Sequence, residues 1–409
     1  MAPSKRRRAS HNQKSPEQSS ATVVSGNEDL LTEILLRLPA QSLLRFKAVS
    51  KNWLSLISDH RFSLHWKNFK SVSPNGLFLR RYSRPKNPNY KLEYVPLDGK
   101  QQQGKRSRPP FRSLSFVDDP LGIKILQSSH GLLLCSSRVD HPKRNYYVYN
   151  PTTKQFRTLP RPTACSLREV CGIYLAFDPF QSKHYKVVCV SSVGSGRYRI
   201  EIYSPETGTW VTCGDSFNAP LDLSFRNGVF WNGAIHWPSC WSETSLCFDI
   251  NRGSLRTMPM PPIQSGQSIR TYRFFGESRG HLHLVEFFGY FTIQFDVFEL
   301  ERDYSKWFIK YRVDLDVVTT AFPEVLRIQP DPLLHRHHCV FLVFSVVRGE
   351  TENESSLVLY MPGKVISYNL KDKKFKKLCN LVLRQSDVDN LVWHRSPYIH
   401  QHIESLFCV

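Results

Sequence analysis

Histidine and cysteine side chains gather in one short segment of the chain. His335, His337, His338 and Cys339 offer imidazole and thiolate groups, which are the ligands that zinc prefers. A strongly apolar run follows them, so the segment is predicted to enter a β-strand, and alternate residues of an extended chain point to opposite faces. Too few of the four side chains would then face one ion. We therefore expect no metal site and no bound cofactor.

Other reactive residue types occur in pairs that do not form a catalytic pattern. His281 and His283 share one face of a predicted strand, but they lack a nearby cysteine or acidic partner in sequence. Asp118 and Asp119 suit a turn better than a general acid and base. The phosphate-binding G-x-x-x-x-G-K-[ST] loop, H-E-x-x-H and G-x-S-x-G are absent. The chain is therefore expected not to be an enzyme.

Cysteine usage and the ends of the chain indicate a compartment. The 10 cysteines have irregular spacings without a C-x-x-C pair, which is typical of reduced thiols in a cytosolic or nuclear protein. The N-terminus is polar and basic and lacks the apolar region of a signal peptide. The longest apolar run, residues 339–347, is too short to cross a bilayer. We expect a location in the nucleus and/or cytoplasm, without a membrane.

Basic residues exceed acidic ones, and the formal net charge is +20. In the N-terminal tail, Lys5, Arg6, Arg7 and Arg8 have two interpretations, a nuclear-localisation signal or a solvated disordered tail. Residues 80–112 form a second basic segment. Such charge raises the non-specific affinity for polyanions, so nucleic acid is not the expected partner. A basic nucleic-acid-binding protein remains the alternative class.

The elements that position these residues begin with a helical stretch over residues 27–66. Leu30, Leu31, Ile34, Leu35 and Leu38 fall on one side of a helix. The helix is expected to end there, because the next residue is a proline that suits the first turn of a second helix.

A third helix is expected after Ser50, which is a suitable N-cap residue. The second and third helices carry further apolar residues, among them Phe46 and Ile57. Three helices in about forty residues cannot bury this much apolar surface among themselves. Part of that surface is therefore expected to be covered from outside.

The strings DLLTEILLRLP and SLLRFKAVSKNWLSLISD resemble the F-box of plant F-box proteins. The resemblance implies docking on a Skp-family adaptor, which in turn holds a cullin and a RING subunit. One departure is that Gly26 and Asn27 stand where many F-boxes have Leu-Pro. The adaptor-binding residues that the resemblance implies are Leu30, Ile34, Leu35, Leu38, Pro39, Leu43, Leu44, Val49 and Trp53.

From Gly76 onward the pattern changes to alternation of apolar and polar residues, and a strand-rich unit recurs. The clearest copy is GLLLC followed by YYVYNPTTKQFRTLP, where Asn150 and Pro151 suit the start of a turn between two strands. About six units recur at roughly 45 to 70 residues, close to the period of kelch-type propeller blades. The phrases SSHGLLLC and VYNPTTKQFRTLP also resemble the F-box-associated domain of a large plant family.

These patterns predict an α+β multidomain chain, with a small three-helix F-box followed by a mostly-β domain, a kelch-like β-propeller of about six blade-like units. The expected divisions are a disordered basic tail (1–26), the F-box (27–68), a linker (69–75), the propeller (76–380) and a closing segment (381–409). A β-sandwich or an irregular barrel is the alternative for the β domain. The closing segment suits either a strand or a short helix.

The resemblance also implies a function, that of the substrate-recognition subunit of an SCF-type (Skp-cullin-F-box) E3 ubiquitin ligase. The F-box would dock on the adaptor, and the β domain would bind an unidentified target protein for ubiquitination. Holding the target near a ubiquitin-charged enzyme raises its effective concentration without a catalytic group from this chain. An F-box protein that binds the adaptor without sending a target for degradation is a further alternative.

Overall fold

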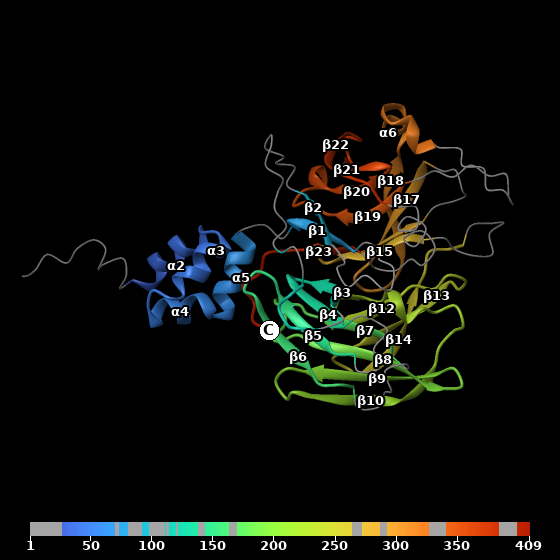
Figure 1. The fold of residues 1–409 in the computed structure, drawn as a ribbon. Coiled ribbons are helices and arrows are strands. Elements are labelled where there is room, and N and C mark those ends of the chain that lie inside the picture. The colour runs from blue at the N-terminus through green and yellow to red at the C-terminus, as the bar shows by residue number, and fades with distance from the viewer. Residues whose placement is uncertain are drawn as a thin grey trace, which may run out of the picture. The chain divides into compact units, whose positions relative to one another are not determined.

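The computed structural model describes residues 27–69, 73–80, 92–97, 111, 114–119, 122–137, 144–162, 170–263, 272–286, 293–326, 341–383 and 399–409. The chain divides into two compact units, Met1–Phe69 and Lys70–Val409 (Figure 1). Two groups of residues discussed above, Lys5 to Arg8 and the histidine cluster before residue 340, lie outside the described residues.

The first unit is helical and contains α2 (Glu28–Leu36), α3 (Ala40–Phe46), α4 (Lys51–Ser58) and α5 (His60–Phe69). The predicted cap at Ser50 is confirmed, because its hydroxyl accepts a hydrogen bond from Trp53 N at 3.2 Å. The expected count of three helices was too low. Asp59 has an extended backbone and its carboxylate accepts from Arg61 N at 2.7 Å, so it ends α4 and begins α5.

The additional helix α5 supplies core that three helices lack. It packs against α2 and α4 and contributes Trp66, which is 2% exposed. The indole of Trp66 donates to Leu38 O at 3.0 Å and so satisfies a carbonyl just beyond the end of α2. Leu35, Leu43 and Ile57 are completely buried in the same unit.

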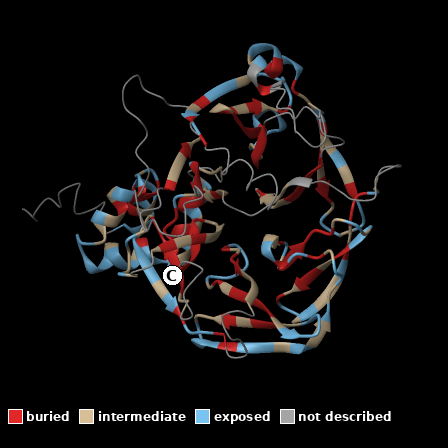
Figure 2. Cartoon of the chain, turned by 45° about the vertical axis from the view of Figure 1, so that its right-hand side comes forward, coloured by how far each residue is buried: buried red, intermediate tan, exposed pale blue. Residues whose placement is uncertain are grey.

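The described strands of the second unit form six antiparallel sheets, which confirms the expected propeller of about six blades and makes the sandwich and barrel alternatives wrong. Figure 2 shows the sheets arranged around a ring. In order along each sheet, the strands are β2 (Leu92–Pro96), β1 (Gly76–Arg80) and β23 (Ile399–His402); β3 (Ile123–Ser129), β4 (Leu132–Ser137), β5 (Tyr146–Asn150) and β6 (Gln155–Leu159); β10 (Thr209–Asn218), β9 (Arg197–Ser204), β8 (Lys186–Gly194) and β7 (Val170–Ala176); β11 (Val229–Trp231), β12 (Ala234–Trp237), β13 (Thr244–Asp249) and β14 (Ser254–Pro259); β15 (Tyr272–Ser278), β16 (His281–Glu286), β17 (Gln294–Leu300) and β18 (Trp307–Asp314); and β19 (Leu342–Val347), β20 (Ser356–Met361), β21 (Gly363–Asn369) and β22 (Phe375–Leu381). Short helices α6 (Asp316–Ala321), η1 (Phe225–Asn227), η2 (Pro323–Leu326) and η3 (Glu352–Glu354) lie in the connections.

The ring is closed by pairing the two ends of the β domain in one sheet. β23 pairs with β1 in a register that runs from Gly76 opposite His402 to Leu79 opposite Ile399. This pairing decides the open question about the closing segment, which supplies a strand. Closure also removes two sheet edges that would otherwise be unpaired.

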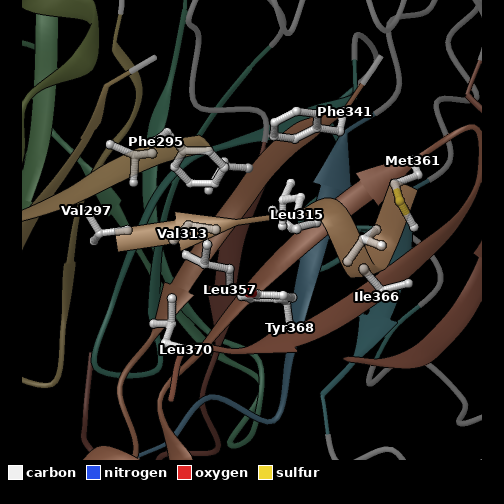
Figure 3. Close-up of a cluster of buried hydrophobic side chains, with 14 of the residues drawn as sticks. Phe295, Val297, Val313, Leu315, Phe341, Leu357, Met361, Ile366, Tyr368 and Leu370 are labelled. Atoms are coloured by element: carbon white, nitrogen blue, oxygen red, sulfur yellow. The ribbon is translucent and has the colours of Figure 1, made fainter. Parts of the chain in front are cut away.

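Apolar side chains fill the spaces between neighbouring sheets. Between the last two sheets, Val297 and Val313 face Leu357, Ile366 and Tyr368 (Figure 3). Burying each such aliphatic side chain contributes about 1.5–3 kcal/mol. The outermost strands of the ring instead carry many exposed residues (Figure 2).

A further contact between sheets recurs. Trp210 is the second residue of the outer strand of one sheet, and its indole donates to Pro160 O, just after the outer strand of the preceding sheet, at 2.8 Å. Trp307 is the first residue of the outer strand of a later sheet and donates to Pro259 O at 2.8 Å. The same hydrogen bond thus joins two different pairs of neighbouring sheets.

Candidate functional site

The helical unit displays large apolar side chains although its own core is complete. Leu30 and Ile34 on α2 are 48% and 47% exposed, and Val49 before α4 and Leu54 within it are 60% and 47% exposed. Exposed aliphatic residues are normal when scattered, but several on one small unit mark an interaction surface. Leu54 belongs to the apolar surface expected for the third helix, but it was not among the expected adaptor-binding residues.

The residues expected to bind an adaptor separate into two groups. Leu30, Ile34, Pro39 and Val49 are exposed, and Leu38, Leu44 and Trp53 are half-buried. The ring of Trp53 packs edge-on against Phe46, with centroids 5.3 Å apart.

Leu35 and Leu43 form the other group, and their expected role needs correction. Both are 0% exposed in the core of the helical unit. They therefore offer no surface to a partner in this conformation. The reason is that the apolar stripe of a helix can be wide enough for one part to pack into the core of its own unit while another part stays exposed to solvent.

The propeller carries a cavity of about 320 Å³ on one of its faces. Residues in or next to all six sheets line this cavity, so it lies where the ring converges. Three of the lining elements are tight turns between the first two strands of a sheet: His130–Gly131, Asn232–Gly233 and Arg279–Gly280. We call this feature the central cavity.

The three turns have one backbone conformation. The φ angles are 47° and 89° in the first turn, 47° and 76° in the second, and 56° and 78° in the third. Two successive positive φ angles are typical of the type I′ turn that joins antiparallel strands. In each turn the residue before the glycine carries a side chain that lines the central cavity.

Charged side chains of the central cavity are partly paired with each other. Arg348 contacts the carboxylate of Glu299 and lies 3.0 Å from Glu352 Oε1. Glu277 accepts a hydrogen bond from Gly280 N at 2.6 Å, and Asp178 accepts from Phe180 N at 3.0 Å.

Glu299 is also the acidic partner that the two strand histidines lack in sequence. It lies on β17 opposite His283 of β16, and its Oε1 is 2.8 Å from His281 Nδ1. Burial raises the pKa of Glu299, but contacts with His281 and His283 outweigh burial and hold that pKa well below its usual range. Burial lowers the pKa of His283. This cluster stabilises two adjacent sheets through Arg348.

Within the described ranges, no group of three or more histidine, cysteine and acidic side chains is placed to hold a metal ion. No helix in that part of the chain is long and apolar enough to span a membrane.

Comparisons with known proteins match both units. A family model described as F-box domain matches residues 27–65, and one described as F-box associated beta propeller domain matches residues 95–319. The chain is 36% identical to F-box protein At5g07610 of Arabidopsis thaliana, over 95% of this chain and 93% of that protein. It is 28% identical to F-box protein At5g49610 of the same plant, over 63% of this chain and 71% of that protein.

Proposed function

We propose that this chain, which belongs to the family of F-box proteins with an F-box-associated β-propeller domain, is the substrate-recognition subunit of an SCF-type E3 ubiquitin ligase. In this role the F-box docks on a Skp-family adaptor, and the adaptor connects it to a cullin and a RING subunit. The propeller binds the target protein.

The observation that carries the proposal is the exposed apolar surface of the F-box. Leu30, Ile34, Val49 and Leu54 remain in solvent although the unit has its own buried core. A partner that covers them gains the free energy of removing apolar area from water, roughly 25 cal/mol per Å² before the costs of association. A few central anchors are expected to supply most of that free energy.

The proposed role is non-catalytic. The receptor holds its target near a ubiquitin-charged enzyme and thereby converts a bimolecular encounter into one at high effective concentration. The chain then needs two binding surfaces, one on each unit, and no reacting group of its own.

The test is the affinity of the full chain for a Skp-family adaptor. We expect Ile34→Ala combined with Val49→Ala to weaken adaptor binding at least about tenfold, because both side chains are exposed apolar groups on the F-box. The matched control is Val211→Ala, since Val211 is 59% exposed but lies on propeller strand β10. Equal affinities of the double variant and the control would contradict the assigned surface.

The second part of the test is ubiquitin transfer. The full chain, assembled with adaptor, cullin and RING subunit, should promote transfer to proteins that co-purify with the propeller. Adaptor binding without any such transfer would instead favour an F-box protein that does not direct degradation.

A further inference from the structure

Arg302 is an exposed cation at the central cavity, in the turn between β17 and β18. In the described part of the chain it pairs with no carboxylate. Its guanidinium lies over the neighbouring turn, because a methyl group on Gly280 would stand 3.2 Å from Arg302 Nη2. The side chain therefore has donors that the described residues leave unused.

Arg279 presents a second guanidinium from that neighbouring turn. Its Nη2 lies 3.5 Å from Glu350 Oε1, which is long for a hydrogen bond, and the Glu350 side chain is 58% exposed. Its Nη1 is buried and makes no hydrogen bond within the described residues. A buried donor without a partner is rare in a folded protein and calls for a physical reason.

The backbone at Arg279 is also unusual for its residue type. Its φ is 56°, a conformation in which asparagine, aspartate and histidine are enriched among non-glycine residues. The equivalent positions in two other sheets are occupied by such residues, His130 and Asn232. Arginine lacks this preference, so the backbone of Arg279 is held in a conformation that its residue type rarely adopts. Residues held in such conformations cluster at functional sites.

The other charged side chains that line the central cavity do not pair with these two arginines in the described part of the chain. Arg348 is paired with Glu299 and Glu352. Glu277 and Asp178 keep their negative charges, but each accepts a hydrogen bond from a backbone N–H of its own loop, and in the described part of the chain neither forms an ion pair with Arg279 or Arg302. The donors that remain belong to Arg279 and Arg302. The net charge of +20 on the whole chain further favours encounter with an acidic partner.

We propose that the central cavity binds an acidic side chain of the target protein, with Arg279 and Arg302 as the two cations that receive it. Phe180, which is 55% exposed, lines the same cavity and offers an apolar contact beside the anion. The proposal rests on the proposed function, in which the propeller binds the target. A carboxylate and a phosphorylated hydroxyl share the chemistry that two guanidinium groups recognise.

The test uses the full chain and immobilised heptapeptide pools in which the central residue is glutamate, phosphoserine, serine or lysine and the other positions are randomised. We expect the glutamate and phosphoserine pools to retain the protein at least about tenfold more strongly than the serine and lysine pools. A preference for phosphoserine over glutamate would identify phosphate as the anion, and equal retention would show that a carboxylate suffices.

Two variants locate the site. Arg279→Asn removes the cation and introduces a residue that favours the positive φ of this turn, so the fold is retained. Arg302→Gln removes the second cation at similar size. Each is expected to lose about tenfold of the retention of acidic pools. The matched control is Arg252→Gln, because Arg252 is 75% exposed in the turn between β13 and β14 and does not line the central cavity.

Any one of four results would overturn the proposal: no discrimination among pools, no retention of the protein by any pool, a preference for lysine, or an acidic preference that survives in both variants. Adaptor binding is measured on the same preparations. Loss of adaptor binding with an intact acidic preference would refute the ligase role and leave the anion site standing, so the two failures are distinguishable.

Discussion

Asn150 is expected to hold the C-terminal residues in the ring, and its replacement by alanine tests this. The side chain is 0% exposed, and its Nδ2 donates to Ser405 O at 3.0 Å and to Phe407 O at 2.8 Å. Its Oδ1 accepts from Thr152 N at 2.9 Å and Thr153 N at 3.3 Å. One amide thus closes a turn and binds the tail that follows β23.

The cost of Asn150→Ala follows from those four hydrogen bonds. Ser405 and Phe407 are 2% and 3% exposed, so their carbonyl groups would lose a partner with little access to water. A buried polar group left unpaired costs about 1–3 kcal/mol, and each lost turn bond costs about 0.5–1.5 kcal/mol. We therefore expect a loss of roughly 4 kcal/mol in the free energy of unfolding of the propeller.

Asn369 provides the matched control. It occupies the same place in the turn between β21 and β22, where its Oδ1 accepts from Lys371 N at 2.8 Å and Asp372 N at 3.0 Å. Its remaining hydrogen bond, to Asn353 O, is exposed, so water replaces it readily. Asn369→Ala should cost only about 1–2 kcal/mol.

The assay is urea unfolding combined with amide hydrogen exchange of residues 399–402. Asn150→Ala should shift the unfolding midpoint much further than Asn369→Ala and should increase exchange in β23, because the strand next to the tail opens more often. Equal shifts for the two variants, or unchanged protection of β23, would refute the reasoning.

Two further predictions concern stability. Burial lowers the pKa of His236 to about 3 and that of His402 to about 4. In the unfolded chain a histidine has a pKa near 6.5, so below that pH the unfolded state binds protons that the folded state does not. The free energy of unfolding is therefore greatest above pH 6.5 and falls as the pH drops toward the folded pKa, by about 2 kcal/mol per histidine at pH 5. Thermal unfolding at pH 7.5 and pH 5 checks this, and equal melting temperatures would contradict it. Lys373 has a φ of 58°, at a position where the equivalent turns of two other sheets have Gly208 and Gly253. Lys373→Gly should therefore raise the free energy of unfolding by up to about 1 kcal/mol. Lys374→Gly is the control and should lower it, because Lys374 does not have a positive φ. Calorimetry of the two variants decides the sign.

Local sequence patterns were enough to predict the elements of both units. Ser50 forms a cap because a hydroxyl there reaches the N–H group three residues later, whatever surrounds it. Asn150 and Pro151 begin a turn between two strands for an equally local reason. The recurrence of strand-rich units indicated the number of sheets, because each blade is built from consecutive residues.

Tertiary structure decided which of the predicted residues are available to partners and which charges meet. Helical spacing cannot separate Ile34, which is exposed, from Leu35, which is buried, because both belong to one apolar stripe and only the position of α5 divides it. Glu299 reaches His281 through strand register rather than sequence proximity. Arg279 and Arg302 meet at the central cavity because the antiparallel pairing of β16 with β17 places the turns of two successive hairpins at the same end of one sheet. The two residues are too far apart in sequence for a local pattern to predict this contact.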